Sequence, residues 1–220
     1  HELCMKYDTQ NVDVAIRSSA TAEDLPTASF AGLQETYLNV RGEKELLAAC
    51  KKCFASLFTA RAIVYREEKE FDHFEIALSV GVQKMIRADK GSSGVIFTID
   101  TETGFSNAIV INGAWGLGEN VVRGIVNPDQ FTVFKPLLED TTLVPIVEKK
   151  LGNKEQKMVY SSDDDNKVKN VNTTPEEQSQ YVLTDTEIIV LAQWAKTIEE
   201  HYQRPMDIEW VKDARTNDLY

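Results

Sequence analysis

Seven residues near the C-terminus carry the clearest structural signal in the chain: Arg204-Pro205-Met206-Asp207-Ile208-Glu209-Trp210. Apolar and acidic residues alternate along the last five of them, which predicts a β-strand over Met206–Val211. Successive side chains of a strand point to opposite faces, so Asp207 and Glu209 share one face, with Cα atoms roughly 6.5–7 Å apart. The apolar residues around them are expected to face the other way, toward a core.

This acidic pair has two interpretations that spacing alone leaves open. Two carboxylates on one face repel each other unless a positive group lies beside them. Mg²⁺ commonly binds proteins through one or two carboxylates together with substrate phosphates, so Asp207 and Glu209 are candidate metal ligands. A solvent-facing acidic pair on an edge strand would show the same spacing.

A helix is predicted directly before this strand. Thr184 is a good N-cap residue, and Glu187, three residues later, completes a capping box. Leu183 and Ile188 are placed for the hydrophobic staple that often accompanies such a start. The helix is expected to run to about His201.

A second helix is predicted from Gly42 to about Glu68, since apolar residues recur there at three- and four-residue steps. Cys50 and Cys53 lie in this helix and are assigned to packing, because no second cysteine pair or histidines follow at a spacing that suits zinc. Short apolar or alternating runs predict strands over Val12–Ile16, Glu35–Val40, Ile76–Ile86, Val95–Ile99, Ala108–Ile111, Gln130–Phe134, Val144–Val147 and Lys157–Tyr160.

Three polar stretches are expected to lack helices and strands. Ser18–Gly32 is interpreted as a long ordered loop, and loops of that length in compact domains are usually functional or disordered. Ala88–Gly94 has turn chemistry, and its last four residues suit either a hairpin loop or a mobile lid over phosphates. Ser161–Gln180 is polar and acidic, and we expect a solvated, mobile connector there.

Composition narrows the function classes. The 220-residue chain has a formal net charge of -11, which makes it a poor candidate for nucleic-acid binding, because phosphate backbones attract a surplus of Lys and Arg. It shows no apolar run of about 18 residues and no signal segment, so neither a membrane helix nor secretion is expected. Three cysteines argue against a disulfide framework, and we expect a cytoplasmic protein. Because a new strand is predicted to begin near Tyr220, we also expect the natural chain to continue.

Two further motifs suit phosphate chemistry, each with a plainer alternative. A guanidinium followed by small hydroxyl residues at a strand end suits phosphate recognition, although an arginine in a surface salt bridge looks the same: Arg17-Ser18-Ser19-Ala20-Thr21. The glycine-rich run Gly113–Glu119 could let the backbone approach a ligand, or it could simply turn. The three histidines, His1, His73 and His201, have no Ser-His-Asp or Cys-His context.

Taken together and in order, these segments resemble the nucleotide-binding domain of the phosphoenolpyruvate synthase family. The segments that carry the resemblance are Val14–Pro26, Ser29–Gly32, Glu35–Val40, Ala114–Glu119, Gly124–Asp129 and Arg204–Trp210. Pyruvate phosphate dikinase, rifampicin phosphotransferase and glucan water dikinase share parts of the pattern and remain alternatives. Asn127–Gln130 and Phe97–Thr101 are most similar to the synthases.

The resemblance implies an α+β ATP-grasp fold, in which two lobes with mostly antiparallel sheets and flanking helices hold ATP between them. It implies an ATP-dependent phosphotransferase, a pyruvate, water dikinase, that uses ATP as substrate and Mg²⁺ as cofactor. In that family ATP gives its β-phosphoryl group to a histidine on a separate domain, and the γ-phosphate leaves as inorganic phosphate. The phosphohistidine then phosphorylates pyruvate in a barrel domain, giving phosphoenolpyruvate and AMP.

The resemblance also implies roles for single residues. Arg17 matches a catalytic arginine that contacts the ATP phosphates, and Gly32 and Thr36 match positions that line the nucleotide. Asp207 and Glu209 match the Mg²⁺-binding acidic pair, with Glu209 also placed among the ATP contacts. The hinge strand that recognises adenine matches Gln83-Lys84-Met85-Ile86.

Some parts of the family pattern have no match in this chain. These are an ATP-binding lysine before the Arg17 strand, a Gln-x-Arg-Pro run after the last strand, and the phosphohistidine and pyruvate-barrel domains. We therefore expect residues 1–220 to be a partial ATP-grasp domain, truncated at both ends, that binds Mg-ATP weakly and cannot complete the reaction alone. Other classes remain open, namely a non-catalytic nucleotide-binding module and a purely structural acidic domain.

Overall fold

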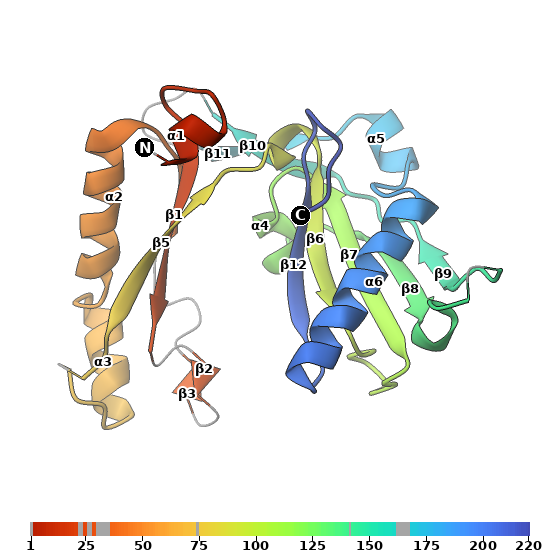
Figure 1. The fold of residues 1–220 in the computed structure, drawn as a ribbon, viewed down its shortest axis with the longest axis horizontal. Coiled ribbons are helices and arrows are strands. Elements are labelled where there is room, and N and C mark those ends of the chain that lie inside the picture. The colour runs from red at the N-terminus through yellow and green to blue at the C-terminus, as the bar shows by residue number, and fades with distance from the viewer. Residues whose placement is uncertain are drawn as a thin grey trace. The chain divides into compact units, whose positions relative to one another are not determined.

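A computed structural model describes residues 2–21, 24–25, 28–29, 36–73, 75–140, 142–161 and 168–220. The chain divides into two compact units, His1–Met85 and Ile86–Tyr220, and passes from one to the other after Met85. Each unit contains helices beside a mostly antiparallel sheet (Figure 1). This confirms the α+β class that the sequence predicts.

The first unit has a three-stranded antiparallel sheet in the order β4-β1-β5. Its strands are β1 (Val14–Ala20), β4 (Thr36–Val40) and β5 (Leu78–Lys84), and its helices are α1 (Glu2–Lys6), α2 (Gly42–Ser56) and α3 (Ala60–Glu68). Two short strands, β2 (Asp24–Leu25) and β3 (Ala28–Ser29), pair with each other. Val14 and Ile16 pack against Ala49 and Cys53 of α2, so one face of the sheet is buried under that helix.

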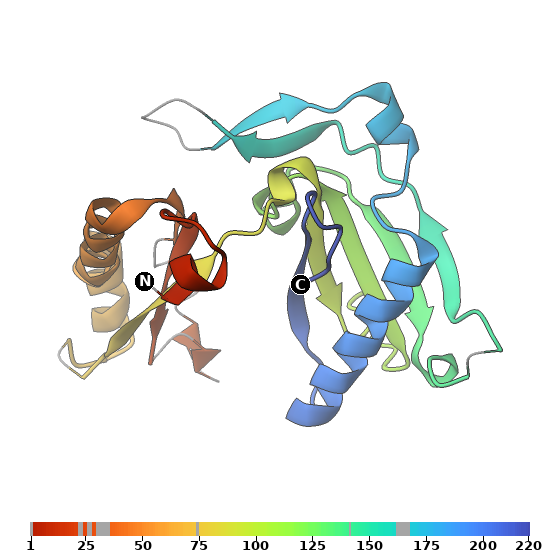
Figure 2. The same ribbon diagram turned by 45° about the horizontal axis from the view of Figure 1, so that its top comes forward.

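The second unit has a five-stranded antiparallel sheet in the order β12-β6-β7-β8-β9. Its strands are β6 (Ser92–Phe97), β7 (Ala108–Trp115), β8 (Asp129–Phe134), β9 (Ile146–Lys150) and β12 (Asp207–Lys212). Helix α6 (Asp185–Tyr202) lies across one face of this sheet (Figure 1). A hairpin of β10 (Gln156–Tyr160) and β11 (Val168–Asn172) leads into α5 (Pro175–Ser179) (Figure 2). Short helical segments η1 (Ala88–Lys90), α4 (Glu119–Val122) and η2 (Lys135–Leu137) complete the unit.

Helix α6 forms as its sequence predicts. The side chain of Thr184 accepts a hydrogen bond from the backbone N–H of Glu187, and the Glu187 carboxylate accepts one from the N–H of Thr184. Leu183 and Ile188 are both buried in the core between α6 and the sheet. Burying a side chain such as Ile188 or Leu191 contributes roughly 1.5–3 kcal/mol, so this apolar face holds α6 on the sheet.

The predicted helix from Gly42 to Glu68 is in fact two helices, so that prediction is wrong at its middle. Helix α2 ends at Ser56, whose hydroxyl donates to the carbonyl of Cys53 at 2.6 Å. Thr59 then has extended backbone angles, and its side chain accepts from the N–H of Ala62, so it caps α3. Ser and Thr form such local bonds readily, which is why they end and start helices.

Two of the predicted loops are partly strand. Strand β1 continues through Arg17 to Ala20, because β5 pairs with it along its whole length, so Ser18–Ala20 are not loop. Residues 22–23, 26–27 and 30–35 lie outside the described residues. Ser92–Gly94 belong to β6, which excludes both the hairpin loop and the lid, and a Cβ at Gly94 would lie 1.8 Å from the carbonyl oxygen of Asn112. Glycine is therefore needed there for close packing of β6 on β7.

The expected mobile connector is also wrong over its second half. Strand β11 pairs with β10 over Val168–Asn172, and α5 starts with a complete capping box between Thr174 and Glu177. Glu177 accepts from Lys157, and its backbone carbonyl accepts from Nε1 of Trp115 at 2.8 Å. These bonds hold α5 to β10 and to β7.

Among the helices of the described residues, none is long and apolar enough to cross a membrane.

Candidate functional site

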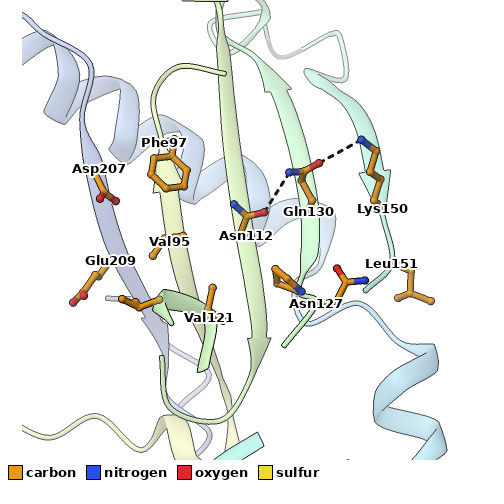
Figure 3. A pocket seen from close by; sticks show the side chains of 12 residues that line it. Val95, Phe97, Asn112, Val121, Asn127, Gln130, Lys150, Leu151, Asp207 and Glu209 are labelled. Carbon is orange, nitrogen blue, oxygen red and sulfur yellow. Dashed lines mark hydrogen bonds between the residues drawn. The ribbon is translucent and has the colours of Figure 1, made fainter. Parts of the chain in front are cut away.

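Strand β12 presents its two acidic side chains on the face of the sheet opposite to α6. Ile208 and Trp210 pack into the core beneath α6, and Nε1 of Trp210 donates to the carbonyl of Asn112 at 3.0 Å. Because side chains alternate along a strand, Asp207 and Glu209 project to the other face, as Figure 3 shows. The strand lies at the edge of its sheet, and both residues are exposed, with the Asp207 carboxylate partly withdrawn from water.

A pocket of about 630 Å³ lies over this face, and the acidic pair forms part of its wall. A volume of that size suits a ligand such as a nucleotide. Strands β6 to β9 form the floor of the pocket, and α4 and the residues before β8 form its rim (Figure 3). The lining residues are Val95, Phe97, Asn112, Val121, Val122, Asn127, Pro128, Gln130, Lys150, Leu151, Asp207 and Glu209.

A row of directly paired residues crosses the floor from the acidic edge to a lysine. Glu209 pairs with Val95, Val95 with Asn112, Asn112 with Gln130, and Gln130 with Lys150. Nε2 of Gln130 donates to Oδ1 of Asn112 at 3.5 Å, and Nζ of Lys150 donates to Oε1 of Gln130 at 3.4 Å (Figure 3). The pocket therefore has two carboxylates at β12 and a lysine at β9, where Nζ of Lys150 also lies 3.4 Å from a carboxylate oxygen of Glu148.

Asn112, Gln130 and Lys150 are pocket residues that the sequence analysis missed. The local signal for Asn112 and Gln130 is that a chain neighbour of each, Ile111 or Phe131, faces the α6 core. Lys150 has no such neighbour, since Lys149 is exposed and Leu151 lines the pocket. Their meeting depends on the register of three strands, and a shift of one residue would turn each of them to the other face.

The electrostatics of the acidic pair favour a bound cation. Burial, followed by the nearby negative charge of Glu209, raises the pKa of Asp207 above its ordinary value. A divalent cation would relieve both effects, and two carboxylates are the hard oxygen ligands that Mg²⁺ prefers. Within the described ranges, no group of three or more His, Cys, Asp or Glu side chains could hold a metal by itself. The donor set thus fits a Mg²⁺ whose remaining ligands are phosphates and water.

A buried ion pair holds the rim of the pocket. Nζ of Lys154 lies 2.5 Å from Oδ1 of Asp129, and both side chains are fully buried. The Asp129 carboxylate also accepts from the N–H groups of Gly152 and Val182, each at 2.8 Å. Gly152 lies so close to the Asn127–Pro128 segment that a Cβ would come within 2.3 Å of its backbone. The pair therefore joins the segment that contains the pocket residue Pro128 to the loop that contains the pocket residue Leu151.

The glycine-rich run Gly113–Glu119 begins inside β7 and has a packing role in this structure. Gly113 belongs to β7, and Gly116 has φ +86, in the left-handed region that favours glycine. A Cβ at Gly116 would lie 2.5 Å from the carbonyl oxygen of Met158, with which Gly116 forms an isolated parallel bridge. Ser93 donates to the carbonyl of Gly116 at 2.6 Å. These contacts fix the turn that leads into α4 at the pocket rim.

Three of the predicted nucleotide residues meet on one face of the first unit's sheet. Arg17 on β1 pairs directly with Thr36 on β4 and with Gly81 on β5. Gln83 lies two residues beyond Gly81 on β5, so its side chain points to the same face. This face is opposite to the one that packs on α2.

The other predicted residues of the first unit lie differently. Lys84 pairs with Val14 and its Nζ lies 4.6 Å from the centre of the Tyr7 ring, so its side chain is on the face opposite to Gln83. Met85 is buried, with its N–H bonded to the carbonyl of Asp13, and Ile86 begins the second unit. Strand β5 ends at Lys84, so the predicted hinge strand ends two residues early. Gly32 lies outside the described residues.

Comparison with known proteins shows which family the chain is similar to. Residues 1–220 match the protein family described as "Pyruvate phosphate dikinase, AMP/ATP-binding domain". The chain is 58% identical over 226 residues to the phosphoenolpyruvate synthase of Aquifex aeolicus, covering 100% of this chain and 26% of that protein. It is 55% identical over 225 residues to the synthase of Helicobacter pylori, covering 99% of this chain and 28% of the relative. With the Escherichia coli synthase the identity is 51% over 218 residues, covering 98% of this chain and 27% of the relative. The chain thus spans about a quarter of the length of these relatives.

Proposed function

Since this chain belongs to the pyruvate phosphate dikinase AMP/ATP-binding domain family, we propose that it is the ATP- and Mg²⁺-binding part of a phosphoenolpyruvate synthase. The match over residues 1–220 and the 58% identity with a synthase support this assignment. The observation that carries it is the acidic pair of β12, Asp207 and Glu209, on the wall of a pocket with Lys150 at its other end.

The proposed overall reaction converts pyruvate, ATP and water to phosphoenolpyruvate, AMP and inorganic phosphate. The β-phosphoryl group of ATP passes to a histidine and then to pyruvate, and water takes the γ-phosphate. The histidine and the pyruvate site belong to other domains of the full-length protein, and the relatives are long enough to contain them, because this chain covers only 26% of the first. A cytoplasmic location is part of the same proposal.

Each unit of the chain has its own proposed role. In the first unit, Arg17 binds the phosphates through its guanidinium fork, Thr36 and Gly32 line the nucleotide, and the Gln83–Ile86 segment contacts adenine. Arg17, Thr36 and Gln83 share one face of their sheet, which supports this grouping. Catalysis of phosphoryl transfer depends mainly on such positioning and on neutralisation of phosphate charge.

In the second unit, Asp207 and Glu209 hold Mg²⁺. When bound there, the cation would neutralise charge on the ATP phosphates and so lower the cost of bringing a nucleophile to them. The raised pKa of Asp207 supports this role, because a cation bound there would favour the charged form of its carboxylate, which burial and Glu209 disfavour. Lys150 is well placed to attract an anionic part of the ligand at the far end of the pocket.

The alternatives differ in the phosphoryl acceptor. The alternative enzymes are pyruvate phosphate dikinase and a dikinase that acts on an antibiotic or a glucan. Each would use a similar nucleotide-binding domain. The relatives named above are all synthases, which favours pyruvate with water. A non-catalytic nucleotide-binding module would bind ATP without turnover.

The test is phosphoenolpyruvate formation by the full-length protein and by its isosteric variant Asp207→Asn/Glu209→Gln. We expect the variant to lose activity by a factor on the order of 10² or more, because removing a preorganised electrostatic group costs that much. A matched control, Glu139→Gln/Asp140→Asn, removes two exposed carboxylates away from the pocket and should keep activity. Full activity of the first variant would contradict the assignment, and ATP binding without any phosphoryl transfer by the wild type would favour the non-catalytic module.

A further inference from the structure

A threonine hydroxyl closes the strand ladder at the point where the acidic strand begins. Strand β12 pairs with β6 from Asp207, opposite Phe97, to Lys212. One residue before that pairing starts, the N–H of Thr98 donates to the carbonyl of Met206 at 3.0 Å. The N–H of Met206 donates in return to the side-chain hydroxyl of Thr98 at 2.8 Å. The hydroxyl of Thr98 is thus the acceptor for a strand N–H, a role that backbone carbonyls have elsewhere in the ladder.

This hydroxyl is held in one orientation by an ion pair. Thr98 is fully buried, and its hydroxyl donates to Oε1 of Glu199 at 3.0 Å. Nζ of Lys135 lies 2.8 and 2.6 Å from the two oxygens of that carboxylate. A hydroxyl has one proton, so donation to Glu199 leaves its lone pairs for the N–H of Met206. The result is a fixed relay from Lys135 through Glu199 and Thr98 to Met206.

The relay acts on a segment that has little other support. Strand β12 lies at the edge of the sheet, and at its Asp207 end it pairs with β6. A second bridge, between Lys212 and Leu219, lies at the opposite end of the strand. The chain arrives from α6 through Gln203, which has left-handed backbone angles, and through the exposed residues Arg204 and Pro205. Ends of edge strands open locally at low cost, so the bond at Met206 decides how firmly the next residue, Asp207, is held.

We propose that Thr98 is a positioning residue for the metal pair, and that its bond to Met206, fixed by Glu199 and Lys135, holds the Asp207 carboxylate in place to bind Mg²⁺. The inference rests on the proposed function, since it assumes that Asp207 and Glu209 are the ligands. Outer partners of metal ligands of this kind typically change metal affinity by about 10- to 100-fold when they are removed. Thr98 itself faces the core and does not touch the ligand.

A purely structural role predicts different behaviour. If the relay only held the last turn of α6 on the sheet, removal of the hydroxyl would lower stability and leave the Mg²⁺ dependence unchanged. If it positions Asp207, the Mg²⁺ requirement must change in protein that is still folded. Metal binding and turnover therefore separate the two roles when they are measured at a temperature well below unfolding.

The experiment uses the full-length protein with Thr98→Val, which keeps the shape of the side chain and removes the hydroxyl. Direct titration with Mg²⁺ in the presence of α,β-methylene-ATP should show binding weakened about 10-fold or more. The Mg²⁺ concentration for half-maximal activity should rise by a similar factor, while kcat at saturating Mg²⁺ changes less. In metal-free protein the amide of Met206 should exchange its hydrogen faster. Thr98→Ser, which keeps the hydroxyl, should restore all three properties.

The matched control is Thr197→Val on α6, where the hydroxyl donates to the carbonyl of Gln193 in the same helix at 2.9 Å. It should leave Mg²⁺ binding and Met206 exchange unchanged. Wild-type Mg²⁺ affinity in folded Thr98→Val would overturn the proposal. If that variant does not fold, Thr98→Ala removes the same hydroxyl with less bulk and is judged by the same criterion.

An Asp207→Asn variant in the same titration separates this proposal from the proposed function. Weaker Mg²⁺ binding in Asp207→Asn but not in Thr98→Val would remove the positioning role and keep the metal pair. Unchanged Mg²⁺ binding in Asp207→Asn would mean that the metal assignment itself is wrong.

Discussion

Burial and the adjacent carboxylate of Glu209 both raise the pKa of Asp207, so the charged form of this residue destabilises the metal-free fold. The folded protein then keeps the proton of Asp207 to a higher pH than the unfolded chain does. Stability falls with rising pH wherever the folded state binds more protons. The penalty is therefore absent below the ordinary carboxyl pKa and grows as pH rises through the raised pKa of the folded state.

Asp207→Asn removes this charge, and it should increase the free energy of unfolding of the metal-free protein at neutral pH. The gain should shrink as pH falls through the ordinary carboxyl range, where wild type and variant converge. Chemical denaturation at a series of pH values measures this. Glu139→Gln is the opposite control, because a bond from Lys196 lowers the pKa of Glu139, and its removal should give no gain. If Asp207→Asn does not increase the free energy of unfolding at neutral pH, the electrostatic account of the pair is contradicted.

Single residues were predictable where one local rule decides them. Alternation along Met206–Trp210 predicts that Asp207 and Glu209 share a face, and the packing of Ile208 and Trp210 under α6 agrees with it. Lys150 could not be predicted, because it reaches the pocket only through the register of β8 with β9. Its strand, Ile146–Lys150, starts two residues later and ends three residues later than the predicted strand Val144–Val147.

Among the elements, the loop around Gly152 shows how buried charge organises the pocket rim. The Asp129–Lys154 pair joins the start of β8 to this loop and, through the N–H of Val182, to the segment before α6. A buried charge costs much free energy to desolvate. When one partner of the pair is removed, the other stays buried without compensation and destabilises the protein.

Lys154→Met should lower the free energy of unfolding by about 3–5 kcal/mol, because it leaves the Asp129 carboxylate buried without its cation. Urea denaturation measures this loss. The matched control is Lys149→Met, which removes an ion pair with Asp185 whose two side chains are 34% and 63% exposed. Exposed pairs of this kind contribute about 0–1 kcal/mol, so the control should change stability little. Equal losses in the two variants would contradict the role assigned to the buried pair.

Elements with strong end signals were predicted correctly, and those decided by distant partners were not. The capping box at Thr184 gave α6 its start, and alternation gave β8. The break at Thr59 was missed because the apolar spacing continues across it into α3. Strand β11 was missed because its residues are polar, and it forms by pairing with β10 rather than by its own propensity.

At the scale of the whole molecule, the chain has two compact units that meet in sequence between Met85 and Ile86. The first unit carries the proposed phosphate and adenine contacts, and the second carries the proposed metal ligands. The family resemblance predicted the α+β class and the order of the segments, because it depends on many short motifs together. It could not predict the relay at Thr98, which depends on contacts among residues that lie far apart in the chain.

The most direct test of the central claim is a calorimetric titration of the full-length protein with ATP, with and without Mg²⁺, beside the Asp207→Asn/Glu209→Gln variant. The account predicts that wild-type binding is strengthened by Mg²⁺ and that the variant loses this dependence while keeping a weaker, metal-independent affinity for ATP. Equal strengthening by Mg²⁺ in the folded variant would show that the metal is held elsewhere, and the acidic pair of β12 would then have no part in binding it.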